Sequence, residues 1–219
     1  MDVTTAVHAR ISARDFLADP VDDAVLRQLL VDASYAPSGG NLQPWRIYVV
    51  NGESMARLRE YLPTQPPLEA GEYDIYPKAL TEPYRTNRFT IGEQMYATLG
   101  IARDDKQGRF QQFARNGDFF GAPAALFCFV DRQMGLPQWS DLGMFLQTVM
   151  LLAREAGLHT CAQEIWTNMH RTVGEFIAIP AHQMLFCGMA IGWRDETHPV
   201  NRLRTERAPL GEFASFRGI

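Results

Sequence analysis

Arginine side chains gather near both ends of the chain, and their spacing could bind a phosphate group. Arg10 and Arg14 stand near the start, whereas Arg202, Arg204 and Arg207 stand near the end. Both groups occupy segments without helical periodicity, beside small or polar residues. Because a phosphate is held best by several charged, often forked, donors, two converging clusters would form one site. For either cluster alone, solvated surface arginines are the alternative.

A polar loop between a helical and a strand-like segment is the second feature whose residue types suit ligand binding. It runs from Ala36 to Trp45 with the sequence Ala-Pro-Ser-Gly-Gly-Asn-Leu-Gln-Pro-Trp. Two prolines stiffen the backbone and a glycine pair permits unusual conformations, so the loop can follow a fixed, irregular path. The hydroxyl and amide groups of Ser38, Asn41 and Gln43 suit the edges of a flat, heteroatom-rich ligand. An ordinary helix-to-strand turn is the alternative.

Several familiar catalytic and cofactor motifs are missing from the sequence. No G-x-G-x-x-G follows a strand-like segment and no G-x-x-x-x-G-K-[ST] occurs, so neither a Rossmann dinucleotide site nor a P-loop is recognisable. The five histidines are scattered, without a nucleophile elbow or a telling carboxylate pair. Side-chain acid–base or nucleophilic chemistry is therefore not indicated, which favours chemistry carried by a cofactor that the protein positions.

Length and composition indicate one ordinary globular domain over residues 1–219. The chain is 46% hydrophobic and 21% charged, and its net charge of −4 gives no reason to expect a nucleic-acid partner. Cys128, Cys161 and Cys187 lie far apart without metal-ligand spacing, so no metal site is expected and a reducing cytoplasm fits best. The apolar stretches are too short to span a bilayer and the N-terminal segment is polar, which predicts no membrane partner.

Hydrophobic periodicity predicts the elements that position these residues. Helices are expected over residues 3–9, from Asp22 or Asp23 to about Ser34, and over residues 54–61, 92–100, 104–115, 141–156 and about 168–177. Strands are expected over residues 46–50, 124–130 and 183–193, the last two apolar enough to be central in a sheet. The Pro- and Tyr-rich residues 62–91 are predicted to form a long loop, and the segment after Asn201 an arm without periodicity.

The segment 141–156 is the most apolar of the predicted helices. Little polar surface is left between its apolar positions, which are Leu142, Met144, Phe145, Leu146, Val149, Met150, Leu151 and Leu152. A helix that is apolar all round must be buried on all sides, which in a chain of this size indicates a subunit interface as much as a core. Gly157 is expected to end it.

Four segments together resemble the FMN-dependent nitroreductase family, and its nitrobenzoate- and nitroaromatic-reducing members in particular. They are Arg10-x-Ser12-x-Arg14-x-Phe16, the loop 36–45, the run Gly-Leu-His-Thr-Cys-Ala-Gln at 157–163, and the stretch from Gly192 to Pro209. They occur in the family's order and spacing, and the resemblance covers nearly the whole chain. It implies an α+β, nitroreductase-like fold with a central, mostly antiparallel sheet flanked by helices. It also implies an intertwined homodimer with FMN in the interface and a swapped C-terminal arm.

The resemblance assigns the flavin phosphate and the polar flavin edge to the two ends of the chain. The N-terminal contacts to phosphate, ribityl chain and pyrimidine edge match Arg10, Ser12 and Arg14. The C-terminal phosphate ligand matches Arg207. A basic residue is common two positions earlier in the family; Thr205 stands there in this chain, and Arg204 or Arg202 is the expected substitute.

Two loops and a variable segment match the family's remaining flavin contacts. The positions that reach a flavin bound mainly by the other subunit match Pro37, Ser38, Gly39 and Asn41. The segment beside the dimethylbenzene ring and N5 matches Ala162, Gln163 and Glu164, although proline is common in the family where Ala162 stands. Asn87 or Arg88 matches a polar contact near the pyrimidine. Trp45 is expected to anchor the strand that follows rather than to contact the ligand.

The activity that the resemblance implies is that of an NAD(P)H-dependent flavin oxidoreductase. Hydride would pass from NADH or NADPH to flavin N5 and then, in a ping-pong sequence, to a small nitroaromatic or similar electron-poor acceptor. No catalytic side chain is needed, and Arg14 is the candidate for stabilising negative charge at the N1–C2 edge. Candidate walls of the acceptor pocket are Phe119, Phe120 and Trp139, which are equally well explained as core residues.

Three alternatives stay open on the sequence. The same scaffold could support flavin-dependent dehydrogenation, dehalogenation or ene reduction, because a fold does not fix a function. A non-catalytic flavin-binding protein, which would show no NAD(P)H oxidation above background, is an alternative of another class. A structural dimer module without cofactor is the third, and it predicts a colourless purified protein.

Overall fold

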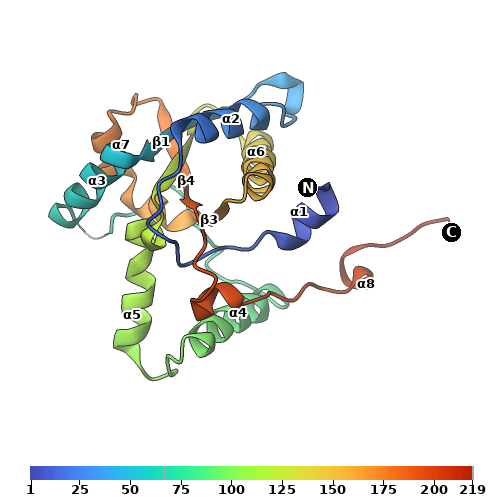
Figure 1. The fold of residues 1–219 in the computed structure, drawn as a ribbon. Coiled ribbons are helices and arrows are strands. Elements are labelled where there is room, and N and C mark those ends of the chain that lie inside the picture. The colour runs from blue at the N-terminus through green and yellow to red at the C-terminus, as the bar shows by residue number, and fades with distance from the viewer. Residues whose placement is uncertain (67, 219) are drawn as a thin grey trace.

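The computed structural model describes residues 1–66 and 68–218, and these residues contain a four-stranded sheet in the order β1-β2-β4-β3 (Figure 1). Its strands are β1 (Trp45–Asn51), β2 (Ala124–Asp131), β3 (His159–Gln163) and β4 (Gln183–Gly192). All three pairings between neighbouring strands are antiparallel. The predicted α+β fold with a central antiparallel sheet is therefore confirmed. Pro67 of the predicted 62–91 loop and Ile219 of the predicted arm lie outside the described residues.

Eight α-helices are present in the described residues. They are α1 (Val3–Ala9), α2 (Asp23–Ala33), α3 (Gly52–Tyr61), α4 (Tyr84–Thr98), α5 (Lys106–Ala114), α6 (Leu136–Glu155), α7 (His170–Ile177) and α8 (Leu210–Phe213). The helix α2 begins where the sequence predicts, because the side chain of Asp22 accepts a hydrogen bond from the Ala24 N–H. No helix in the described part of the chain is both long and apolar enough to cross a membrane.

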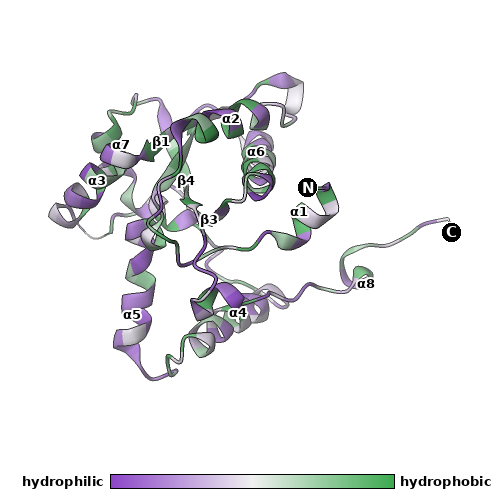
Figure 2. Ribbon diagram, viewed as in Figure 1, coloured by the Kyte–Doolittle hydropathy of each residue, from purple (hydrophilic) through white to green (hydrophobic). Residues whose placement is uncertain are grey.

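Two hydrophobic clusters cover the two faces of the sheet. Residues Leu126, Cys128 and Val130 of β2 belong to the cluster packed under α2 and α6, whereas Phe127 and Phe129 belong to the opposite cluster. Every β2 residue before Asp131 is buried, which is expected for a central strand with helices on both faces. Hydrophobic colour accordingly follows the central strands, while α5 is largely hydrophilic (Figure 2).

Three elements differ from the sequence-based expectation. The helix α4 begins at Tyr84, inside the predicted loop, because the Glu82 carboxylate accepts from the Thr86 N–H and pairs with Arg85 in the first turn. The strand β3 was not predicted, since a five-residue edge strand gives little periodic signal. The helix α6 starts five residues earlier than expected, with proline at Pro137 in its first turn, where a missing N–H costs nothing.

The helix α6 is buried on one face only within the chain. Its buried apolar side is formed by Leu142, Phe145, Leu146, Val149 and Ala153. Gly143 and Gln147 are exposed, and Met144 is 39% exposed. The core of the single chain therefore covers only one side of this helix, and the expected subunit interface on the other side stays a prediction.

Candidate functional site

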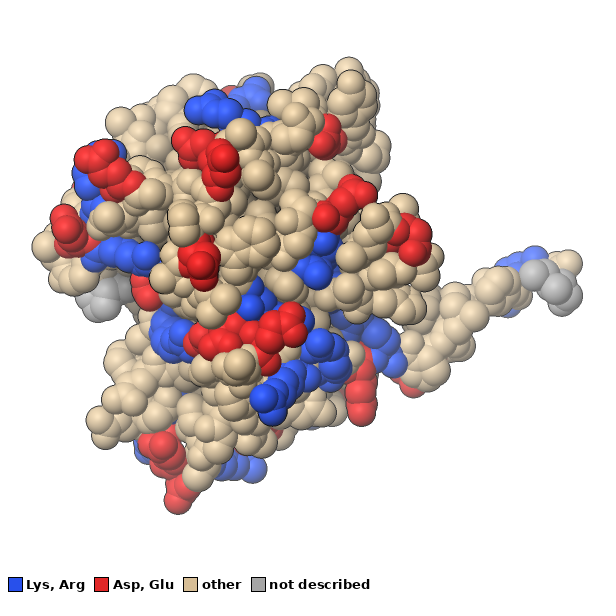
Figure 3. All heavy atoms as spheres, in the orientation of Figure 1, with Lys and Arg blue, Asp and Glu red and all other residues tan. Residues whose placement is uncertain are grey.

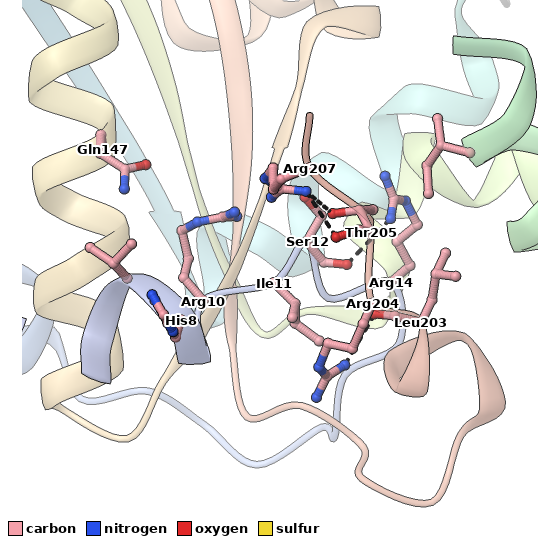
Figure 4. A pocket seen from close by; sticks show the side chains of 12 residues that line it. His8, Arg10, Ile11, Ser12, Arg14, Gln147, Leu203, Arg204, Thr205 and Arg207 are labelled. Carbon is pink, nitrogen blue, oxygen red and sulfur yellow. Dashed lines mark hydrogen bonds between the residues drawn. The ribbon is translucent and has the colours of Figure 1, made fainter. Parts of the chain in front are cut away.

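The two arginine-containing ends of the chain meet at a cavity of about 590 Å³ (Figure 4). Arg10, Ser12 and Arg14 line it from the N-terminal segment, and Leu203, Arg204, Thr205 and Arg207 line it from the C-terminal one. The predicted convergence is confirmed for four arginines. Arg202 does not line this cavity; it is exposed and donates to the Thr197 carbonyl at 3.2 Å.

Positive charge dominates the cavity, whose described lining residues include no carboxylate. Neutral backbone carbonyls orient three of the guanidinium groups. Arg14 donates to the Ser12 carbonyl at 3.4 Å, Arg204 to the Asn201 carbonyl at 3.0 Å, and Arg207 to the Glu206 carbonyl at 2.8 Å. Such bonds direct the side chains without neutralising them. Because like charges repel at close quarters, the arrangement favours binding of a multiply charged anion such as a phosphate. Basic side chains gather across the middle of this face, among acidic ones (Figure 3).

The N-terminal arginines are presented by an extended segment that runs beside β3. Ser12 forms a parallel bridge with Thr160, and the Ala13 N–H donates to the Thr160 carbonyl at 3.0 Å. In extended backbone alternate side chains point to opposite sides, and Ala13 is fully buried while Ser12 and both neighbouring arginines reach the cavity. Ile11 lines the cavity as well, so the alternation is seen at Ala13 but not at Ile11. Arg10, Ser12 and Arg14 share one cavity, as predicted.

Asn201 joins the two ends of the chain. Its side chain is buried, and its Oδ1 accepts from the Arg14 backbone N–H at 2.9 Å. Its Nδ2 donates to the carbonyls of Asp15 and Asp195, both at 2.8 Å. Sequence reasoning missed this role, because the partners at Arg14 and Asp15 lie far away in the chain and a lone asparagine in a turn gives no signal of them.

The loop residues Pro37, Ser38, Gly39 and Asn41 lie outside this cavity. The loop follows α2 and reaches α6, where the Gly39 N–H donates to both carboxyl oxygens of Asp141 at 3.3 Å (Figure 1). The chain's own cavity and this loop are thus separate.

Trp45, at the end of the loop, stacks on Phe145 with ring centroids 4.8 Å apart, which confirms that it anchors β1.

The residues predicted to lie beside the flavin ring are at the end of β3. Ala162 is exposed, whereas Gln163 is buried and its Nε2 donates to the Asn116 carbonyl at 2.9 Å, so this side chain is engaged within the fold. Glu164 follows, and partial burial raises the pKa of its carboxyl. Burial also raises the pKa of the Cys161 thiol, an effect that the positive charges of Arg14 and Arg10 oppose.

Asn87 lies one helical turn before Ile91 on α4, and Ile91 lines the cavity. Residues four apart share a helix face, so Asn87 stands on the side of α4 that faces the site. The other proposed walls lie elsewhere. Phe119 and Phe120 are 1% and 2% exposed and belong to the hydrophobic core, so the core alternative is confirmed for these two. Trp139 is half-buried and packs edge-on against Tyr73 with ring centroids 5.0 Å apart, and its place in an acceptor pocket stays a prediction.

His159 opens β3 close to this positive charge. It is buried, and its Nδ1 accepts from Arg154 Nη1 at 3.1 Å. Burial, reinforced by the charges of Arg154 and Arg194, lowers the pKa of His159 from 6.5 to about 3. The imidazole is therefore neutral at physiological pH, and it does not contribute a further cation to the site.

The fold and this site define a member of the nitroreductase family, to which the chain belongs: the family model matches residues 7–193. The chain is 35% identical over 214 residues to the nitrobenzene nitroreductase of Ectopseudomonas oleovorans, covering 96% of this chain and 94% of that protein. It is 44% identical, with a TM-score of 0.94 and full coverage of both chains, to the FMN- and NADPH-dependent nitroreductase NfnB of Sphigopyxis sp. strain HMH. NfnB of Mycobacterium smegmatis, solved in complex with NADPH, gives 28% identity, a TM-score of 0.92, and coverage of 98% and 97%.

Replacing Asn201 with alanine is expected to lower the free energy of unfolding by about 2–4 kcal/mol, because one backbone N–H and two carbonyls lose their partner. Urea unfolding followed by tryptophan fluorescence measures the change. Arg202→Ala, an exposed neighbour, is the matched control and should alter stability by less than about 0.5 kcal/mol. Equal stability of the two variants would contradict the role given to Asn201.

The pKa of His159 predicts a loss of stability in acid. Its folded-state pKa of about 3 lies below 6.5, so the unfolded chain binds the proton more readily and stability is lost as the pH falls from 6.5. Between pH 7 and pH 5 this group should cost about 1–2 kcal/mol of unfolding free energy. His159→Gln, which does not titrate, should lose correspondingly less over that interval in urea unfolding. A parallel pH dependence in both proteins would show the assignment to be wrong.

Proposed function

We propose that this chain is an FMN-dependent oxidoreductase that uses NADH or NADPH to reduce nitroaromatic compounds. The observation that carries the proposal is the cavity in which Arg10, Arg14, Arg204 and Arg207 converge without a carboxylate among the described lining residues. One relative with the same fold is named as an FMN- and NADPH-dependent nitroreductase and another as an FMN-dependent nitroreductase in complex with NADPH, which supports the same cofactors here. Nitroaromatic reduction is supported by the name of the nitrobenzene-reducing relative.

The residues of the cavity fit a flavin mononucleotide. A volume of about 590 Å³ lies within the range of small-ligand sites. Arg10, Arg204 and Arg207 supply the forked donors for a phosphate, and the Ser12 hydroxyl can bond a sugar-like chain. Along β3, Thr160 and Gln163 are about 10 Å apart at the usual strand rise, so Ala162–Glu164 would lie away from a phosphate held by these arginines.

When bound, FMN supplies the hydride transfer between the nicotinamide donor and the nitroaromatic acceptor through its N5 atom. The protein's part is position and charge. Arg14 would hold a positive charge beside the pyrimidine edge of a bound flavin, where negative charge develops. Ala162 would leave β3 open to the flavin ring, because its side chain is a single methyl group and is exposed. No protein nucleophile is required for these steps.

The functional unit in this proposal is a homodimer with FMN at its interface. The uncovered face of α6 and the separation of the 37–41 loop from its own cavity support it. The C-terminal arm carries exposed apolar side chains at Leu210, Phe213 and Phe216, which a partner subunit would cover. The acceptor is a small aromatic molecule, and a cytoplasmic location stays a prediction from the cysteine usage.

Arg14→Ala should weaken FMN binding at least tenfold and slow anaerobic reduction of the flavin by NADPH, because a charge-assisted contact is removed from the ring edge. Flavin fluorescence titration and stopped-flow absorbance measure the two effects. Arg202→Ala removes a guanidinium outside the cavity and should leave both unchanged. Unchanged occupancy and rate in Arg14→Ala would refute the role of Arg14.

The absorbance spectrum of the purified protein tests the proposal as a whole. Flavin bands near the usual visible maxima, bleached by NADPH and restored by a nitroarene, are the expected result. A protein that binds FMN but oxidises no NAD(P)H above background would be a flavin carrier. Faster reoxidation by enones or halophenols than by nitroarenes would assign a sibling chemistry on the same scaffold.

A further inference from the structure

Asp141 has a buried carboxyl group directly beneath the 37–41 loop. It lies in the second turn of α6 and is 4% exposed. Both carboxyl oxygens accept from the Gly39 N–H at 3.3 Å, and no other protein donor reaches them in the described part of the chain. A buried carboxyl group is costly unless it is hydrogen-bonded, so its presence here ties the helix to the loop.

The loop needs such an anchor because its backbone is strained. Asn41 and Gln43 have φ angles of 57° and 47°, in the left-handed region that non-glycine residues rarely occupy. The Ser38 hydroxyl accepts from the Gln43 N–H at 2.9 Å and closes the loop on itself. That contact fixes the shape of the loop, whereas the bond from Gly39 to Asp141 fixes its position on a rigid helix.

The anchored loop stands away from the cavity of its own chain. Gln147 of α6 lines that cavity, and Asp141 precedes it by six residues, or about 9 Å along the helix axis. The exposed residues Gly143 and Met144 lie between them. In a two-fold dimer formed on this uncovered face, each subunit presents the same patch to the other, so the loop of one subunit can reach the cavity of its partner.

We propose that Asp141 is a positioning residue that acts across the dimer: it sets the 37–41 loop where Ser38 and Asn41 contact the flavin in the partner subunit's cavity. The inference rests on the proposed function, since it needs both the homodimer and FMN. Asp141 itself does not touch the flavin. Its effect passes through the Gly39 N–H, so a replacement that still accepts this hydrogen bond preserves the effect.

Two substitutions and a control test the contact on the full-length dimer. Asp141→Ala removes the acceptor and should weaken FMN binding at least tenfold and shift the visible flavin spectrum. Asp141→Asn keeps a carbonyl oxygen and should bind FMN within about threefold of the unsubstituted protein. Ser140→Ala removes an exposed neighbour that bonds only the Pro137 carbonyl, and should change nothing. Equal FMN affinity in Asp141→Ala and the unsubstituted protein would overturn the proposal.

Subunit mixing tests whether the effect crosses the interface. Asp141→Ala and Arg207→Ala chains carrying different tags are co-expressed, and the heterodimer is isolated. If Asp141 acts on the partner's cavity, one cavity of the heterodimer is affected by both substitutions and the other cavity by neither. About half of the FMN occupancy and nitroarene reduction should therefore return. If Asp141 served its own cavity, each site would carry one defect, and the heterodimer would be as impaired as either homodimer.

FMN binding by the unsubstituted protein distinguishes a failure of the proposed function from a failure of the inference about Asp141. An unsubstituted protein that binds no FMN would refute the proposed function and this inference together. A protein that binds FMN normally, with a heterodimer that recovers nothing, would refute the inference alone. If Asp141→Ala does not fold, Asp141→Leu fills the space with apolar atoms while still removing the acceptor, and it takes the same place in the heterodimer.

Discussion

Four guanidinium groups surround one cavity, and no carboxylate among the described lining residues of that cavity neutralises them. The rest of the structure must hold these like charges close together. The fold supplies the restraint through uncharged contacts. Asn201 ties the backbone of Arg14 to the C-terminal segment, and the bridge between Ser12 and Thr160 ties the N-terminal segment to β3. The positive potential is thereby left for an anion, and a bound phosphate group would relieve the repulsion among the arginines.

Much of this arrangement could be predicted from the sequence. The apolar runs of β2 and β4 indicate buried central strands, and the spacing of Arg10 and Arg14 in an extended segment places both on one face. Family resemblance adds the expectation that the two chain ends meet. The site-forming residues are predictable because arginine clusters and loop composition are local features.

Other features depend on contacts between distant segments, which a single sequence does not reveal. Asn201 bonds the backbone of Arg14 and Asp15, and Asp141 that of Gly39, all more than 100 residues away, so these contacts leave no local motif. The strand β3 is defined by its pairing with β4 rather than by its own periodicity. The exposed side of α6 carries Met144 beside Ser140 and Gln147, and only the packing of the chain shows which of its apolar residues are buried.

We propose that the arginine cavity recognises the phosphate of FMN. Calorimetric titration of the flavin-free protein with FMN and with riboflavin, at low and high salt, tests this recognition. FMN should bind at least 100-fold more tightly than riboflavin, and added salt should reduce the difference in affinity, because screening weakens charge-assisted contacts. Equal affinities for the two flavins at low salt would contradict it.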